Sequence, residues 1–158
     1  MDKNYRLILA FLLIAVILGG CQKNTAGITL DVEECANLLK EAITFSDTLA
    51  AVSSELITTI YQIKPEDVVT HKVYAGTGAT AEEIAVFEAV NNEAALRIEE
   101  ALQRYIAERK AAFADYLPLE LPKLEEPFLK VEGNYVVLCI SDQNETAAAV
   151  LDKLINDK

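Results

Sequence analysis

One cysteine of this chain has neighbours that suit a covalent modification. Cys21 follows Leu18, Gly19 and Gly20, which is the aliphatic, small, small, cysteine order of a bacterial lipobox. In that motif the thiol receives a diacylglyceryl group in the plane of the membrane. The small residues let a peptidase approach the backbone and cut it between Gly20 and Cys21. The spacing therefore predicts a lipid attached to Cys21.

The residues before Cys21 have the pattern of a secretory leader. Lys3 and Arg6 precede an unbroken apolar run of twelve residues, Leu7 to Leu18. A helix that crosses a bilayer needs roughly twenty such residues. Twelve behind a cationic start fit a signal peptide better than an uncleaved anchor. Because two acyl chains hold a protein stably on a membrane, we expect the mature chain on the cell membrane, facing outside the cytoplasm.

Cleavage before Cys21 divides the chain into three segments. They are a signal peptide (1–20), a lipidated cysteine and tether (21–30), polar over residues 22–27, and a single domain (31–158). Without Lys3, Arg6 and Asp2 the chain has 12 basic and 24 acidic residues, a net charge of −12. That charge repels nucleic-acid phosphates. The partners we expect are the membrane, through the lipid, and an envelope protein or a wall ligand, with no nucleic acid.

Few residues of the domain have the spacing of a catalytic or metal site. The sequence has no CxxC, no Cys/His cluster and no calcium-loop pattern, so no metal and no cofactor is expected. The glycines of GTGAT (76–80) lack the Lys-Ser/Thr of a P-loop, which favours a hairpin loop over a phosphate cradle. His71, the only histidine, has no GxSxG motif or reactive cysteine to accompany it, so no catalytic residue is assigned.

Two further groups of residues leave alternatives open. Glu120, Glu125 and Glu126 lie in a proline-rich connection, where they either bind a cation weakly or form a solvated loop. Cys35 and Cys139 are able to form a disulfide in an exported protein. Two separate buried thiols fit the sequence as well.

The tyrosines suggest one position for a ligand or partner. Most of them fit a core in which the hydroxyl lies at the rim. Tyr74, however, lies just before the glycine loop. Together with His71 and Thr77 it defines the surface that we expect to face a ligand or partner.

Helices and strands must position these residues. Asp31 and the glutamates after it are typical of a helix start, and a second helical pattern runs from Leu49 to Ile63. The β-branched stretch Val68–Ala75 is predicted to pair with a strand at Ile84–Val90. The alternative, one helix of thirty-seven residues from Thr80 to Tyr116, exceeds the usual range.

The second half of the chain has the clearer patterns. Asn91 or Asn92 is expected to cap a long helix from Glu93 to about Tyr116. The stretch FLKVEGNYVVLCIS predicts a hairpin turning at Gly-Asn, in which Glu132 pairs with Tyr135. A last helix follows Asp142, and its apolar residues are expected to face the core: Ala147, Val150, Leu151, Leu154 and Ile155. The fold class is therefore α+β, an antiparallel sheet of two hairpins with helices packed against it.

Four segments resemble a known family. They are TTIYQI (58–63), VYAGTGATAEEIAVFEA (73–89), FADYLP (113–118) and GNYVVLCISD (133–142). They are similar to a bacterial lipoprotein family known only as domain of unknown function 4358, with GATAEEIAV as the most specific part. The resemblance implies a surface lipoprotein of Gram-positive bacteria and supports a strand at EEIAVFEA. It implies no catalytic residues.

Three functions remain compatible with the sequence. The first is a membrane-anchored, non-catalytic binding or accessory module outside the cytoplasm, and it requires no chemistry that the sequence lacks. The second is a cell-envelope hydrolase that uses His71 or the loop carboxylates. The third is a structural surface protein. We expect the first.

Overall fold

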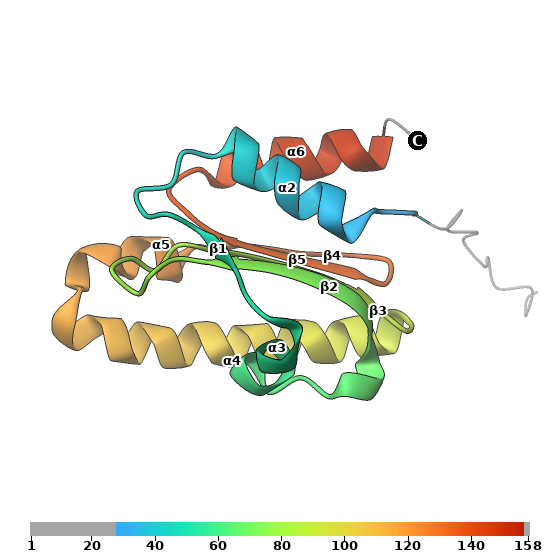
Figure 1. The fold of residues 1–158 in the computed structure, drawn as a ribbon, viewed down its shortest axis with the longest axis horizontal. Coiled ribbons are helices and arrows are strands. Elements are labelled where there is room, and N and C mark those ends of the chain that lie inside the picture. The colour runs from blue at the N-terminus through green and yellow to red at the C-terminus, as the bar shows by residue number, and fades with distance from the viewer. Residues whose placement is uncertain (1–27, 157–158) are drawn as a thin grey trace, which may run out of the picture.

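A five-stranded antiparallel sheet separates two layers of helices in residues 28–156, the part of the chain that the computed structural model describes (Figure 1). The leader and Cys21 lie outside the described residues. In chain order the elements are α2 (Val32–Ala42), β1 (Ala50–Ala51), α3 (Ser54–Tyr61), the 3-10 helix η1 (Pro65–Asp67), β2 (Val68–Ala75), β3 (Glu83–Ala89), α4 (Asn92–Tyr116), the 3-10 helix η2 (Pro118–Glu120), α5 (Leu121–Glu125), β4 (Phe128–Glu132), β5 (Tyr135–Ile140) and α6 (Asn144–Asn156).

The strand order β1-β2-β3-β5-β4 places β3 and β5 in the interior of the sheet. All six residues of β5 are buried, and so are all of β3 except Glu88. A strand covered on both faces must be apolar at odd and even positions alike. This explains why YVVLCI and IAVF have no polar residue in alternation.

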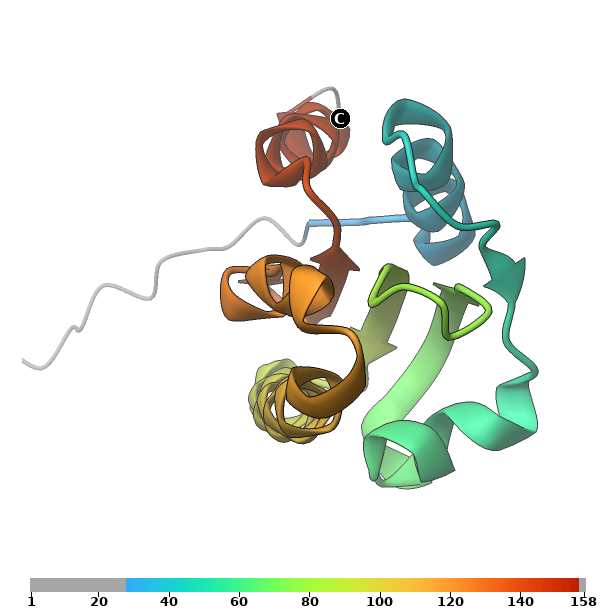
Figure 2. The same cartoon turned by 90° about the vertical axis from the view of Figure 1, so that its left-hand side faces the viewer.

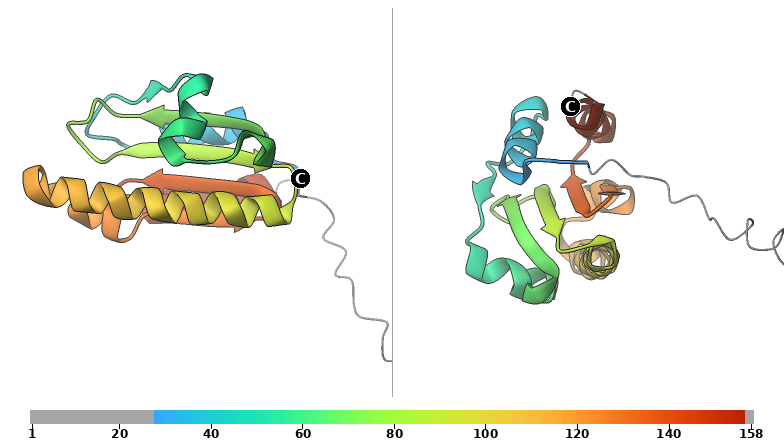
Figure 3. Two further views of the ribbon diagram at one scale, coloured as in Figure 1. Left: turned by 90° about the horizontal axis from the view of Figure 1, so that it is seen from below. Right: turned by 90° about the vertical axis from the view of Figure 1, so that its right-hand side faces the viewer.

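Helices cover the two faces of the sheet unequally. The long helix α4 lies along one face beside α3, whereas α2 and α6 lie on the other face (Figures 2 and 3). Each face has its own hydrophobic core. One core contains Phe87 with Ile98 and Leu102 of α4, and the other contains Val86 with Leu39 of α2 and Leu151 of α6.

The two predicted hairpins are confirmed. Residues of β2 pair antiparallel with β3, from Ala75 opposite Glu83 to Val68 opposite Ala89. In the second hairpin Glu132 pairs with Tyr135. Gly133 has a φ of +59°, which the first residue of a primed two-residue turn requires.

Helix starts also follow the sequence. The Asp31 carboxylate accepts a hydrogen bond from the Glu34 amide at 2.8 Å and caps α2. The Asn91 side chain accepts one from the Ala94 amide at 2.8 Å and caps α4. The single long helix from Thr80 is excluded, because Glu83–Ala89 form the strand β3. The α+β fold class is therefore confirmed.

The helical pattern between Leu49 and Ile63 was only partly right. Ala50 and Ala51 form the short strand β1 instead, and the helix begins at Ser54. The buried residues of this helix are Ile57 and Tyr61, whereas Leu56 and Ile60 are exposed. The proline-rich connection after α4 contains η2 and α5. Within residues 28–156, every helix is too short or too polar to cross a bilayer.

Candidate functional site

The three residues of the expected ligand surface lie in different environments. His71 of β2 packs against Phe87, with 6.0 Å between the ring centroids. Both of its ring nitrogens are buried and have no hydrogen-bond partner in the described part of the chain. Burial lowers the pKa of His71 below its ordinary value, so the ring is neutral at pH 7. Its nitrogens are not available to solvent.

Tyr74 belongs to the other face of the sheet. Its side chain lies in the core beneath α2, where the hydroxyl donates a 2.6 Å hydrogen bond to Asn37 Oδ1. The Nζ atoms of Lys40 and Lys72 lie 4.4 Å and 5.3 Å from the centre of its ring. Thus His71 and Tyr74 do not share a surface. The ring of Tyr74 already makes cation–π contacts with two lysines of its own domain.

Thr77 lies in the exposed loop between β2 and β3. Its amide and its hydroxyl both donate to Asp47 Oδ2, at 2.6 Å and 2.8 Å. A Cβ added to Gly76 would lie 2.7 Å from the same oxygen, so glycine permits this close approach. An aspartate therefore occupies the place where a bound phosphate would need positive groups, which agrees with a hairpin loop rather than a phosphate cradle.

Two adjacent carboxylates are buried at the start of β3, each with 2% of its surface exposed. Glu82 accepts hydrogen bonds from the amides of Ser46 (3.1 Å) and Asp47 (2.9 Å) and from Lys123 Nζ (3.0 Å). Burial would raise the pKa of Glu82, but these donors together hold it below its ordinary value. Glu82 is therefore ionised and joins the segment after α2 to α5.

Lys123 completes this charged cluster. Its ammonium lies 3.1 Å from Glu120 Oε2 and 3.5 Å from Asp142 Oδ2, in addition to Glu82. Glu120 also accepts the Ala81 amide at 2.9 Å. The lysine thus fills the position at which a metal ion would neutralise these carboxylates. Among the described residues, no group of three or more His, Cys, Asp or Glu side chains could hold a metal ion.

Glu83 points to the opposite face of the sheet and has a different set of donors. It accepts the hydroxyls of Tyr61 (2.8 Å) and Tyr105 (2.7 Å) and the Arg109 guanidinium (2.7 Å). Burial raises the pKa of Glu83, while Arg109 and the two hydroxyls act in the opposite direction. Burial also raises the pKa of Tyr61 and Tyr105, so both hydroxyls keep their protons and donate. This cluster joins α3 and α4 to the end of the sheet.

The buried carboxylates hold the fold together rather than offering a reactive group. Both oxygens of each carboxylate accept hydrogen bonds from groups of the same chain. The sequence pattern placed both glutamates between the glycine loop and the strand predicted at Ile84–Val90 and gave them no role. The available signal was two consecutive glutamates followed directly by a strand that is apolar on both faces.

The two cysteines of the domain are free and buried. Cys35 and Cys139 both belong to the core between the sheet and the pair α2 and α6. Burial raises the pKa of each thiol to about 12, so both are protonated and unreactive at neutral pH. The interpretation as separate buried thiols agrees with this arrangement.

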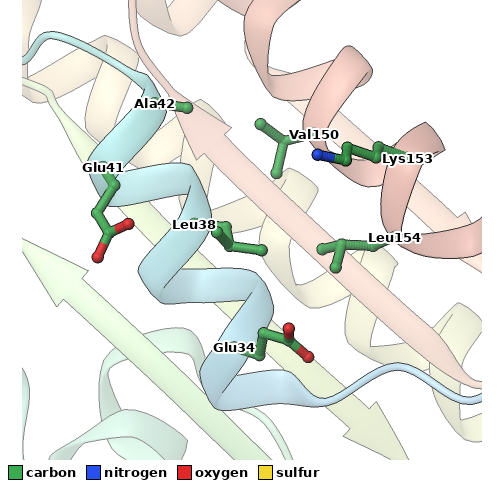
Figure 4. A pocket seen from close by; sticks show the side chains of 7 residues that line it. All are labelled: Glu34, Leu38, Glu41, Ala42, Val150, Lys153 and Leu154. Atoms are coloured by element: carbon green, nitrogen blue, oxygen red, sulfur yellow. The ribbon is translucent and has the colours of Figure 1, made fainter. Parts of the chain in front are cut away.

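The surface best suited to binding lies elsewhere, between α2 and α6. A groove of about 660 Å³ runs between these helices. Figure 4 shows Leu38 of α2 and Val150 and Leu154 of α6 pointing toward one another across it. These side chains are half-buried, whereas Glu34, Glu41 and Lys153 at the rim are exposed. The lining residues are Glu34, Leu38, Glu41, Ala42, Val150, Lys153 and Leu154.

Helical spacing explains how the groove forms. In α2, Glu34, Leu38 and Glu41 lie four and three residues apart and therefore share one face of the helix. In α6, Val150 and Leu154 are separated by four residues and share a face in the same way. Sequence reasoning assigned Val150 and Leu154 to the core. It did not find the groove, because nothing in the pattern shows that α2 and α6 lie side by side.

Comparison with known families identifies the family of this chain, but that family has no assigned activity. The family described as domain of unknown function, DUF4358, matches residues 41–141, and the chain belongs to it. The match spans the sheet and both buried carboxylates but ends before α6. No curated protein and no solved structure matches the chain.

Proposed function

We propose that this member of the family is a membrane-anchored lipoprotein that works outside the cytoplasm as a non-catalytic binding or accessory module. The anchoring part rests on the short apolar leader and on Cys21 after Leu18-Gly19-Gly20. The polar residues 22–27 act as a tether between the lipid and the domain. Two acyl chains on Cys21 keep the domain at the membrane surface, where its partner is found.

The binding part rests on one observation, the open apolar groove between α2 and α6. Apolar side chains that stay half-exposed in a concave surface gain free energy when another molecule covers them. The buried charges, by contrast, have partners within the domain. Of the residues considered for hydrolysis, His71 has buried ring nitrogens and Glu125 lies exposed on α5. The groove therefore supports recognition better than chemistry.

Mass spectrometry of the full chain, expressed in a bacterium that processes lipoproteins, tests the anchor. We expect residues 1–20 to be absent and Cys21 to carry acyl chains. Cys21→Ala should abolish acylation and release the protein from the membrane fraction, whereas Cys35→Ala should remain acylated. A chain that keeps residues 1–20 and carries no lipid would contradict the proposal.

Crosslinking in intact cells tests the binding role. We expect a stoichiometric partner that is captured with the unmodified chain and lost with Leu38→Asp, which puts a charge into the groove. Leu96→Asp is the matched control, because Leu96 is 53% exposed on α4, on the other side of the sheet. If the partner is lost with both variants, or with neither, the groove is not the binding site.

A further inference from the structure

The geometry points to an amphipathic helix with basic residues along one flank as the molecule that fills the groove between α2 and α6. This inference rests on the proposed function, since it names the chemistry of the partner that the binding module holds. The shape of the helical layer and the charges at its rim both favour such a helix.

The shape favours a helix. On the other face of the sheet, the 25 residues of α4 lie along the strands as a continuous cover. On the opposite face, two shorter helices border the groove: α2 with 11 residues on one side and α6 with 13 residues on the other. Figure 2 shows these two helices side by side above the sheet. A third helix laid between them packs its apolar stripe on Leu38, Val150 and Leu154, as helix-in-groove complexes do.

The charges favour basic residues on the side of α2. Glu34 and Glu41 are seven residues apart, so about 10 Å of helix axis separates them along the rim. A helix parallel or antiparallel to α2 presents residues at that same spacing. Within residues 28–156 neither glutamate has an ion-pair partner. Lysine or arginine at i and i+7 of the docked helix therefore matches both carboxylates.

The opposite rim has the opposite charge. Lys153 of α6 is exposed and has no ion pair with any residue in the described ranges. Figure 4 shows its ammonium group reaching from α6 toward the groove. An acidic residue on the far flank of the docked helix suits it. The two rims thus specify both the sign of the flanks and the orientation of the helix about its own axis.

The test uses two synthetic peptides of about 18 residues, roughly five helical turns. Both have a leucine stripe; one carries lysines on the flank that faces α2, and the other carries glutamates there. The full chain is placed in phosphatidylcholine nanodiscs, and empty discs measure binding to lipid. Fluorescence anisotropy of labelled peptide gives the affinities.

We expect the lysine peptide to bind about tenfold more tightly than the glutamate peptide, the size that two rim ion pairs supply. The double variant Glu34→Lys with Glu41→Lys should reverse that preference. The control Glu100→Lys with Glu108→Lys changes the net charge equally on α4 and should keep it. Both sets of residues are exposed, so folding is preserved.

Other outcomes overturn the inference. Equal effects of the two double variants would mean general attraction to an acidic surface. Binding that persists in Leu38→Asp would place the peptide outside the groove. Competition by a fatty acid, or self-association through α2 and α6 without peptide binding, would assign the groove to an acyl chain or to a second copy. Acylation of Cys21 is read separately by mass, so failure here leaves the anchor intact.

Discussion

Glu82 and Glu83 are neighbours in the sequence and equally buried, yet their surroundings differ in kind. Glu82 is held by two backbone amides and an ammonium group. Glu83 is held by two tyrosine hydroxyls and a guanidinium. The alternation of side chains along β3 sends them to opposite faces of the sheet. The pKa of Glu82 is lowered, whereas burial raises that of Glu83.

The difference shows two ways of burying a carboxylate. Glu82 depends on charge, because fixed amides and Lys123 compensate an ion that must stay ionised. Glu83 depends less on charge, because deep burial favours its protonated form, although Arg109 and the two hydroxyls act against it. Each carboxylate joins segments that are distant in the sequence, and neither lines the groove between α2 and α6. The network therefore supports the scaffold that presents the groove.

Removing the cation from each cluster gives the largest expected difference. Lys123→Met should lower the free energy of unfolding by about 4 kcal/mol at neutral pH, because Glu82 keeps its two amide donors but loses the cation that balances its buried charge. Arg109→Met should cost less, about 2 kcal/mol, because Glu83 can be protonated and keeps two hydroxyl donors. Urea unfolding measures both, with Arg104→Met on the exposed side of α4 as a control. A larger loss for Arg109→Met would reverse the assignment of the two clusters.

The pH dependence of stability separates the same two groups. The lowered pKa of Glu82 contributes stability above its ordinary pKa of 4.5, and this is lost as the pH falls through its folded pKa. The raised pKa of Glu83 has the opposite sign, so its protonation on acidification toward pH 4.5 stabilises the fold. Glu82→Gln should flatten the loss below pH 4.5. Glu83→Gln should remove the gain above it.

Unfolding midpoints in urea between about pH 7 and about pH 3 check both signs. The two glutamine variants serve as controls for each other, since each changes one carboxylate and leaves its neighbour. Parallel pH profiles for Glu82→Gln and Glu83→Gln would contradict the distinction between them.

Local patterns made much of the fold predictable. The β4–β5 hairpin follows from the Gly133-Asn134 turn and from alternation that admits only one register with a consistent face. The start of α4 follows from Asn91 as a cap. The strand β1 was missed because two alanines carry little preference, and only pairing with β2 makes them a strand.

The sites were less predictable, because their groups come from distant segments. Ser46 lies 36 residues before Glu82 and Lys123 lies 41 residues after it, so no local spacing reveals the cluster. The groove was missed for the same reason, since α2 is the first helix of the domain in the sequence and α6 is the last. The residues that the sequence singled out for a ligand surface were packed instead. Tyr74 lies in one core, and His71 packs against Phe87 of the other.

The smallest expected effects come from the hydroxyl groups, and they show how much of the Glu83 cluster depends on neutral donors. Tyr61→Phe and Tyr105→Phe should each lower the free energy of unfolding by about 1.5 kcal/mol, the usual size for a hydrogen bond to a charged group. Tyr135→Phe is the matched control, because Tyr135 is also buried but its hydroxyl donates no hydrogen bond within residues 28–156. Removal of both hydroxyls in one chain should cost more than the two single losses together, because Glu83 then has Arg109 alone. Strict additivity in this double-mutant cycle would mean that the two donors act independently and that the carboxylate is not shared as the geometry indicates.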